Sequence, residues 1–158
     1  MSQYTATVVW TRPPDAPFKD NKYPRVHEWR FDGGAVVIGS ASPDVVPAPM
    51  SDPAAVDPEE ALVASVASCH MLWFLDLARQ AGFSVAEYED AAEGVMGRIA
   101  PGRMALTRIA LRPRITFEGR APGETELAQL HEQAHARCFI ANSLKTEVVV
   151  EAPAMEPS

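Results

Sequence analysis

The sequence predicts an α+β protein, in which strands and helices are grouped along the chain rather than strictly alternating. Three observations favour this class. Several short segments alternate between apolar and polar residues, which is the two-residue period of a half-buried strand. One long apolar segment, residues 57–80, carries a helix start signal, and a shorter segment near the C-terminus has helical spacing. The expected order is β-β-β-α-β-β-α-β, with a central buried helix packed against antiparallel sheets.

Residues near the N-terminus predict three strands. These strands are expected at residues 4–10, 25–31 and 35–40. Asp32-Gly33-Gly34 is a hairpin turn signal that joins the second strand to the third. Residues 11–24 and 41–56 each contain four prolines, so we expect them to be loops.

The long helix has a well-marked beginning and end. Asp57 can cap it, Pro58 suits its first position, and Glu60 completes a capping box. We expect the helix to run to about Gln80, with Gly82 as its stop. Because the helix is apolar on nearly every side, it should be covered over most of its surface. A dimer would cover it more easily than one chain of this size.

The strand pattern returns after this helix. It covers residues 92–118, is split at Pro101-Gly102, and has a break or an edge at Pro113. A second helix is expected from about Glu124, with its apolar face formed by Leu127, Leu130, His131, Ala134 and Cys138. Residues 146–151 predict a final strand.

Size and charge limit the classes of function. The chain has 158 residues, of which 47% are apolar, so we expect one domain over 1–151 and a flexible tail over 152–158. The formal net charge of −7 argues against a nucleic-acid partner, which usually meets a basic surface. The first residues do not resemble a secretory signal, and Asp76 interrupts the most apolar segment. We therefore expect a cytoplasmic protein with no membrane contact.

Cys69 and Cys138 are the two cysteines of the chain. Two cysteines cannot make a disulfide-rich scaffold, and alone they cannot hold a structural zinc ion. Cys69 falls inside the long helix, and Cys138 ends the second helical face or begins a short helix after it. A free cysteine is often only a small buried hydrophobe. In the cytoplasm the thiols would be free, catalytic or redox-active, and a redox role needs a group that lowers a thiol pKa.

A zinc site is an alternative to a thiol site. The segment from His131 to His135 reads HEQAH, in which two histidines share a helix face and a glutamate can act as base. The longer protease motif needs a glycine and a third histidine where this chain has Cys138 and Ala141. Glu147 or Cys138 could complete a ligand set. We expect no metal, because histidines at the edge of an amphipathic helix explain so short a pattern.

Two segments resemble motifs of the OsmC/Ohr family, which contains osmotically inducible and organic hydroperoxide resistance proteins. The segment from Asp57 to Cys69, DPEEALVASVASC, resembles the first cysteine motif of this family. The segment from His135 to Ser143, HARCFIANS, resembles the second, in which a histidine precedes the cysteine by three positions. Phe139 stands where that motif often has proline, which indicates an OsmC-like branch. The order of elements agrees over nearly the whole chain.

This resemblance implies an OsmC-like fold, an intertwined homodimer and a thiol-dependent peroxidase that reduces organic hydroperoxides. It implies that Cys69 is the peroxidatic cysteine and Cys138 the resolving one, reduced in turn by an external dithiol. It also implies that Glu59 is the active-site glutamate and that Arg25, or Arg30 as second choice, activates Cys69. No cofactor is expected.

The neighbours of the first cysteine are expected to form the substrate pocket. The pocket residues would be Arg30, His70, Met71, Trp73, Phe74 and Phe139. Glu59 lies ten residues before Cys69, or ~15 Å along a straight helix, so the glutamate and the arginine should come from a partner chain. Two alternatives remain open at this point. The fold could serve as a non-catalytic small-molecule binder or stress protein, or His131 and His135 could support a metal-dependent hydrolase.

Overall fold

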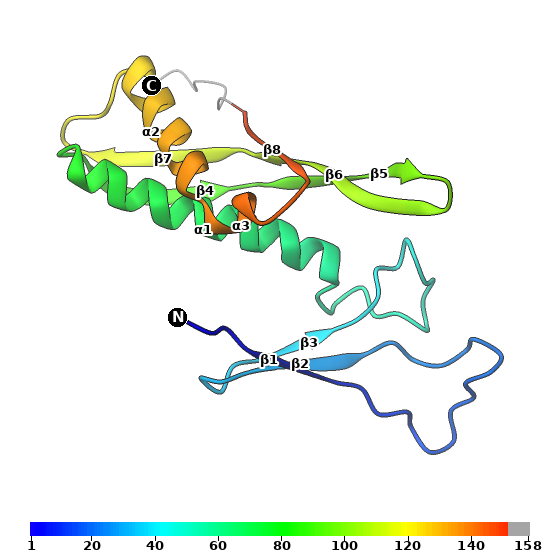
Figure 1. Ribbon diagram of the computed structural model, residues 1–158. Coiled ribbons are helices and arrows are strands. Elements are labelled where there is room, and N and C mark those ends of the chain that lie inside the picture. Colours follow the sequence, from blue (N-terminus) through cyan, green and yellow to red (C-terminus); the bar gives the residue numbers. More distant parts are fainter. Residues whose placement is uncertain (152–158) are drawn as a thin grey trace. The chain divides into compact units, whose positions relative to one another are not determined.

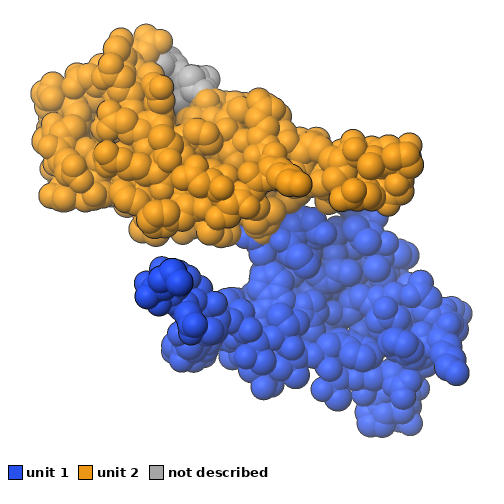
Figure 2. All heavy atoms as spheres, viewed as in Figure 1, with its two compact units in different colours: residues 1–61 blue, residues 62–158 orange. Residues whose placement is uncertain are grey.

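The computed structural model describes residues 1–151, so the tail predicted over 152–158 lies outside the described residues (Figure 1). The α+β class is confirmed, with the element order β1-β2-β3-α1-β4-β5-β6-β7-α2-α3-β8. The chain forms two compact units, Met1–Ala61 and Leu62–Ser158, which are coloured separately in Figure 2. The single domain expected over 1–151 stays a prediction.

The first unit contains a three-stranded antiparallel sheet. Its strands are β1 (Ala6–Val9), β2 (His27–Phe31) and β3 (Val36–Gly39), hydrogen-bonded in that order. All three lie within the predicted segments, although each is shorter than predicted. The predicted turn joins β2 to β3, and Gly34 has a positive φ of 93°, which glycine adopts without strain. The two proline-rich segments form no helix or strand in the described chain.

Helix α1 (Pro58–Gln80) begins where the sequence predicts. The backbone N–H of Glu60 donates to Oδ1 of Asp57 at 2.8 Å, and the N–H of Asp57 donates to Oε1 of Glu60 at 2.9 Å. This is the predicted capping box. The chain leaves the helix through Gly82, which has a positive φ of 86°.

The described chain buries only one face of α1. The buried residues are Val66, His70, Phe74, Leu77 and Ala78. Leu72, on another face, is 61% exposed, so the predicted all-round cover is not supplied by this single chain. By length and composition alone α1 could also cross a membrane, a test that core helices of soluble proteins pass as well.

The second unit contains two sheets that pack against α1. One pairs β4 (Ser84–Asp90) with β7 (Pro113–Glu118), and the other holds β5 (Glu93–Ala100), β6 (Arg103–Leu111) and β8 (Glu147–Val150). Strand β8 runs parallel to β6, whereas the other pairs are antiparallel as predicted. Four strands therefore separate the long helix from the second one, where the sequence analysis expected two.

Strand β4 was not predicted from the sequence, because a bulge interrupts the alternation of apolar and polar residues along it. The register of β4 on β7 shifts between Val85 and Glu87. As a result Val85 and Tyr88, three positions apart, both lie half-buried against the core, whereas an unbroken strand places every second residue on one face. Pro113 is the first residue of β7, which agrees with the predicted break.

The core of the second unit has two parts. The first joins α1 to α2 (Glu124–Arg137) through Phe74, Leu77, Ala78, Phe83, Leu130 and Ala134. The second joins α1 to β6 through Val66, Ile109 and Leu111. Helix α3 (Phe139–Asn142) follows α2 after a single residue, Cys138, and the two helices lie beside α1 in Figure 1. This packing determines where the second cysteine lies.

Candidate functional site

The fold brings the two cysteines together. Cys69 lies in the middle of α1 and is half-buried, while Cys138 lies between α2 and α3 and is only 1% exposed. Both are free thiols, and they lie close enough for Cys69 to raise the pKa of Cys138. Residues that are far apart in sequence thus form one dithiol site, which depends on the packing of the helices within the second unit.

The backbone of Cys138 is extended, with φ −65° and ψ 109°, and this breaks the chain between the two helices. Its sulfur accepts a hydrogen bond from the N–H of Ala141 at 3.5 Å and so caps α3. Burial raises the pKa of the Cys138 thiol, and the nearby Cys69 raises it further, while the N–H of Ala141 acts in the opposite direction. Cys138 is therefore the buried thiol that keeps its proton, and Cys69 is the more accessible one.

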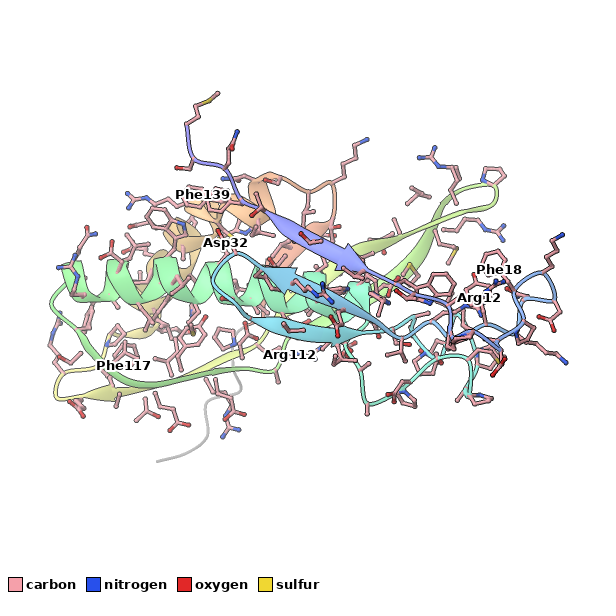
Figure 3. The ribbon with its side chains drawn as sticks, turned by 90° about the horizontal axis from the view of Figure 1, so that it is seen from below. Arg12, Phe18, Asp32, Arg112, Phe117 and Phe139 are labelled. Atoms are coloured by element: carbon pink, nitrogen blue, oxygen red, sulfur yellow. The ribbon has the colours of Figure 1, made fainter. Side chains whose placement is uncertain are left out.

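Aromatic side chains border the dithiol site. The ring of Trp73, one turn after Cys69 on α1, meets the ring of Phe139 edge-on, with centroids 5.4 Å apart. Phe139, labelled in Figure 3, is 66% exposed at the start of α3. The guanidinium of Arg137 lies over Trp73, 5.8 Å from the ring centroid. Arg137 was not among the residues predicted from the sequence, although it directly precedes Cys138.

The other predicted pocket residues of α1 differ in burial. Met71 is half-buried, whereas His70 and Phe74 lie inside the core. Phe74 stacks on His131 with ring centroids 4.5 Å apart and also contacts Tyr88. His70 and Phe74 therefore support the helices from inside the second unit.

Arg25 is held within its own loop in the first unit. Its Nη2 donates to Oδ1 of Asn21 at 2.7 Å, and its Nη1 donates to the carbonyl oxygens of Asn21 and Tyr23. The guanidinium lies over the ring of Tyr23, 3.5 Å from the centroid. Asn21 takes a positive φ of 68°, a conformation that asparagine tolerates better than most residues. Asn21 and Tyr23, which fix the orientation of this arginine, were not predicted from the sequence.

Arg30 and Glu59 have different surroundings. Arg30, on β2, forms an exposed ion pair with Glu28 at 2.7 Å. Glu59 is half-buried in the first turn of α1, and α1 continues unbroken to Gln80. Arg25, Arg30 and Glu59 belong to the first unit. The structure therefore joins the two cysteines in one unit and describes the predicted arginines and glutamate in the other.

The two histidines of the HEQAH segment have different surroundings. His131 faces the core, where its Nδ1 lies 3.0 Å from Nε2 of His70, and His135 is exposed. The described residues contain no group of three or more histidine, cysteine, aspartate or glutamate side chains placed to hold a metal ion. This geometry gives the metal-dependent alternative no support.

Fold and site together define an α+β protein with a paired dithiol between two helices. The chain matches the model of the OsmC-like protein family over residues 51–152, more than half of its length, and it belongs to this family. The matched region contains both cysteines and all of α1. The resemblance noted in the sequence is thus confirmed. No curated protein matches the chain.

Solved structures agree with this assignment. An OsmC-like protein of unknown function from Vibrio cholerae is 47% identical, with 96% of this chain and 99% of that chain covered and a TM-score of 0.93. An organic hydroperoxide resistance protein OsmC from Legionella pneumophila is 17% identical, with 97% and 98% covered and a TM-score of 0.67. An organic hydroperoxide resistance protein from Elizabethkingia anophelis is 18% identical, with 96% of each chain covered and a TM-score of 0.67. The last two share the fold.

Proposed function

We propose that this protein is a thiol-dependent peroxidase that reduces organic hydroperoxides, with Cys69 as the peroxidatic and Cys138 as the resolving cysteine. One observation carries the proposal: two free thiols that are far apart in sequence lie near each other, one half-buried and one buried. The name of the Legionella and Elizabethkingia proteins, organic hydroperoxide resistance protein, supports the choice of substrate. Free thiols also suit a reducing compartment, so we place the protein in the cytoplasm.

The roles of the two cysteines follow from their exposure. A hydroperoxide must reach the attacking sulfur, and Cys69 is the more accessible of the two. The nucleophile is a thiolate, whereas burial raises the pKa of Cys138 and keeps it protonated. Cys138 therefore waits as a thiol until its neighbour has been oxidised.

The reaction takes three steps. The Cys69 thiolate attacks the terminal oxygen of ROOH, the O–O bond breaks, Cys69 becomes a sulfenic acid, and the alkoxide leaves as ROH after taking a proton. The Cys138 sulfur then attacks the Cys69 sulfur, the S–S bond forms, and the hydroxyl group leaves with the Cys138 proton as water. An external dithiol reduces the disulfide by exchange and is itself oxidised.

Apolar surroundings favour an organic substrate. Trp73, Met71 and Phe139 are the aromatic and apolar neighbours of the cysteine segments, and Phe139 exposes much of its ring. Such side chains gain free energy by covering an alkyl or aryl group, which hydrogen peroxide lacks. We therefore expect cumene hydroperoxide to be reduced faster than hydrogen peroxide.

We assign Arg25 as the activating arginine, with Arg30 as the second choice and Glu59 as the glutamate that orients the guanidinium. Arg25 is held in one orientation by Asn21 and Tyr23, as an activating group should be, whereas Arg30 is neutralised by Glu28. A positive charge beside Cys69 would favour its thiolate. Arg25→Met should slow peroxide reduction far more than Arg30→Met. A larger loss of rate in Arg30→Met would instead select Arg30 as the activating arginine.

We also propose a homodimer. Several large apolar residues of the first sheet and of the β5–β6 hairpin are exposed in the single chain: Val8, Phe31, Val36, Ile38, Ile99 and Met104. Leu72 on α1 is exposed as well. A second copy would remove these surfaces from water.

Sedimentation should give twice the mass of the chain, and Leu72→Glu should weaken association while Gln80→Ala, at the exposed end of α1, should not. A monomer at micromolar concentration would contradict this proposal.

A titration of the reduced protein with cumene hydroperoxide tests the peroxidase activity. Counting free thiols should show that both are lost from each chain, without a disulfide-linked species on a non-reducing gel. Cys69→Ser should consume no hydroperoxide, because its remaining thiol is buried. Full retention of both thiols in excess hydroperoxide would overturn the function and leave a non-catalytic binding protein as the better description.

A further inference from the structure

A buried pair of histidines lies close to the dithiol site and has no part in the three steps above. His70 follows Cys69 on α1 and is 1% exposed, and His131 on α2 is 7% exposed. Nε2 of His70 and Nδ1 of His131 are 3.0 Å apart, and the two rings are within 10° of parallel. The pair is a hydrogen bond between α1 and α2 inside an otherwise apolar contact.

The two rings depend on each other for hydrogen bonding. Burial lowers the pKa of each to about 4, with His131 contributing to the lowering at His70, so both rings are neutral at neutral pH. A neutral imidazole has one donor and one acceptor, so one ring donates and the other accepts. The outer nitrogens, Nδ1 of His70 and Nε2 of His131, have no hydrogen-bond partner among the described residues.

Such a pair is a costly way to join two helices. A buried polar atom without a partner costs free energy, and two apolar side chains of similar size would pack without that cost. A hydrogen bond, unlike an apolar contact, is directional and tolerates little displacement of its atoms. The pair therefore contributes a fixed position rather than stability.

The position that it fixes is that of Cys138. His131 lies on α2, and Cys138 directly follows the last residue of that helix, so a shift of α2 would move both side chains together. His70 directly follows Cys69 on α1. The imidazole pair therefore joins α1 to α2, the thiol pair joins α1 to the residue that follows α2, and the first contact can hold α2 where the second requires it.

We propose that the His70–His131 hydrogen bond is a positioning contact for disulfide formation, which holds the Cys138 sulfur against the Cys69 sulfur. The proposal rests on the proposed function for its place in the reaction. The pair should act on the second step and not on the first, because Cys69 belongs to α1 itself whereas Cys138 is carried by α2. Disulfides need closely defined geometry, and a misplacement of about 1 Å can cost about a hundredfold in rate.

Two sets of variants separate the hydrogen bond from the bulk of the side chain. His131→Leu and His70→Leu remove the hydrogen bond and put an apolar side chain of similar size in its place. His131→Asn places an amide near the position of Nδ1, and His70→Gln places one near Nε2, so these variants can restore it. His131→Phe keeps a ring that can stack on Phe74, should the leucine variants fold poorly. His135→Asn is the matched control, because His135 lies on α2 but is exposed.

The two reaction steps are measured separately after rapid mixing with cumene hydroperoxide. Trapping with dimedone follows the sulfenic acid, and thiol counting follows the disulfide. The Leu and Phe variants should form the sulfenic acid within about twofold of the wild-type rate and close the disulfide about ten to a hundred times more slowly. The Asn and Gln variants should recover most of that loss, and His135→Asn should lose nothing. Wild-type closure rates in the folded Leu or Phe variants would overturn the proposal.

A second oxidant keeps this test independent of peroxidase activity. Diamide, an azo compound, accepts two electrons and two protons from a pair of thiols and closes a disulfide without a hydroperoxide. The Leu and Phe variants should close the Cys69–Cys138 bond more slowly than wild type with diamide as well. If wild type reacts with diamide but not with cumene hydroperoxide, the proposed function fails while the positioning role is still decided by the diamide rates.

Discussion

Trp73 meets Phe139 edge-on, with ring centroids 5.4 Å apart, and this contact ties the helix of the first cysteine to the residue after the second. Edge-to-face aromatic pairs are worth ~0.5–1.5 kcal/mol beyond the area that they bury. The segment that carries Cys138 is thus held on both sides: by Phe139 after the cysteine and by His131 before it. The dithiol site is a packed feature of the fold rather than a chance approach of two thiols.

Replacing the buried cysteine should stop the reaction after its first step. Cys138→Ser keeps the accessible thiol of Cys69, so we expect one equivalent of hydroperoxide to be consumed and a sulfenic acid to persist. Mass spectrometry should show a gain of one oxygen on the peptide that contains Cys69, and excess hydroperoxide should carry the sulfur to the sulfinic acid. A variant that turns over repeatedly with the same dithiol reductant would contradict the resolving role of Cys138.

Acid should destabilise the protein through the histidine pair. The pKa values of His70 and His131 are lowered from 6.5 to about 4, so between these values the unfolded chain binds protons that the folded chain does not. The free energy of unfolding should therefore be highest above pH 6.5 and fall as the pH is lowered toward 4. Urea unfolding at several pH values in this range gives the free energy of unfolding at each pH. This free energy should change less with pH in a variant that carries both His70→Leu and His131→Leu. An equal change of the free energy of unfolding with pH in that variant and in wild type would show that other groups cause the pH dependence.

Gly94 is expected to tolerate no larger side chain. A Cβ added there would lie 2.6 Å from Cγ2 of Val63 on α1 and 3.2 Å from Cδ2 of Leu106 on β6. Gly94→Ala should therefore lower the free energy of unfolding by about 1–3 kcal/mol, the usual cost of overpacking. Gly33→Ala is the control, since a Cβ at Gly33 meets nothing within 4 Å. Denaturant titration should separate the two variants, and equal stabilities would show that α1 shifts freely on β5.

The helix cap should contribute measurably to stability. Asp57→Ala removes the acceptor of the Glu60 N–H, and losing such a cap costs about 1 kcal/mol. Asp57→Asn keeps a capping oxygen and should stay near wild type. Thermal unfolding by circular dichroism measures the difference, and the prediction is wrong if the alanine variant melts at the same temperature as the asparagine variant.

Local signals were sufficient to predict much of the fold. The start of α1 depends on Asp57, Pro58 and Glu60, which act within one turn, and the structure confirms it. Features that depend on distant partners were not predictable in this way. The parallel pairing of β8 with β6 depends on residues about forty positions apart, such as Arg108 and Glu147, and no local pattern encodes it.

In the candidate site, too, local features could be predicted from the sequence and contacts between distant residues could not. The sequence places Cys69 and Cys138 on apolar helix faces, and the fold brings the two side chains near each other, while their roles stay a prediction. The partner of His131 could not be predicted, because the HEQAH pattern points to His135 on the same helix, whereas the fold supplies His70 from α1. Helical spacing tells which residues share a face but not what that face meets.

The sulfur of Cys138 accepts a hydrogen bond from the backbone N–H of Ala141 and lies near the thiol of Cys69. Its redox state and the hydrogen bond at the first turn of α3 therefore cannot vary independently, since a sulfur engaged in a disulfide is a different acceptor from a thiol. The amide of Ala141 consequently acts as a built-in indicator of the oxidation state. Its nuclear magnetic resonance shift would report each turnover from the backbone, without a label on either cysteine.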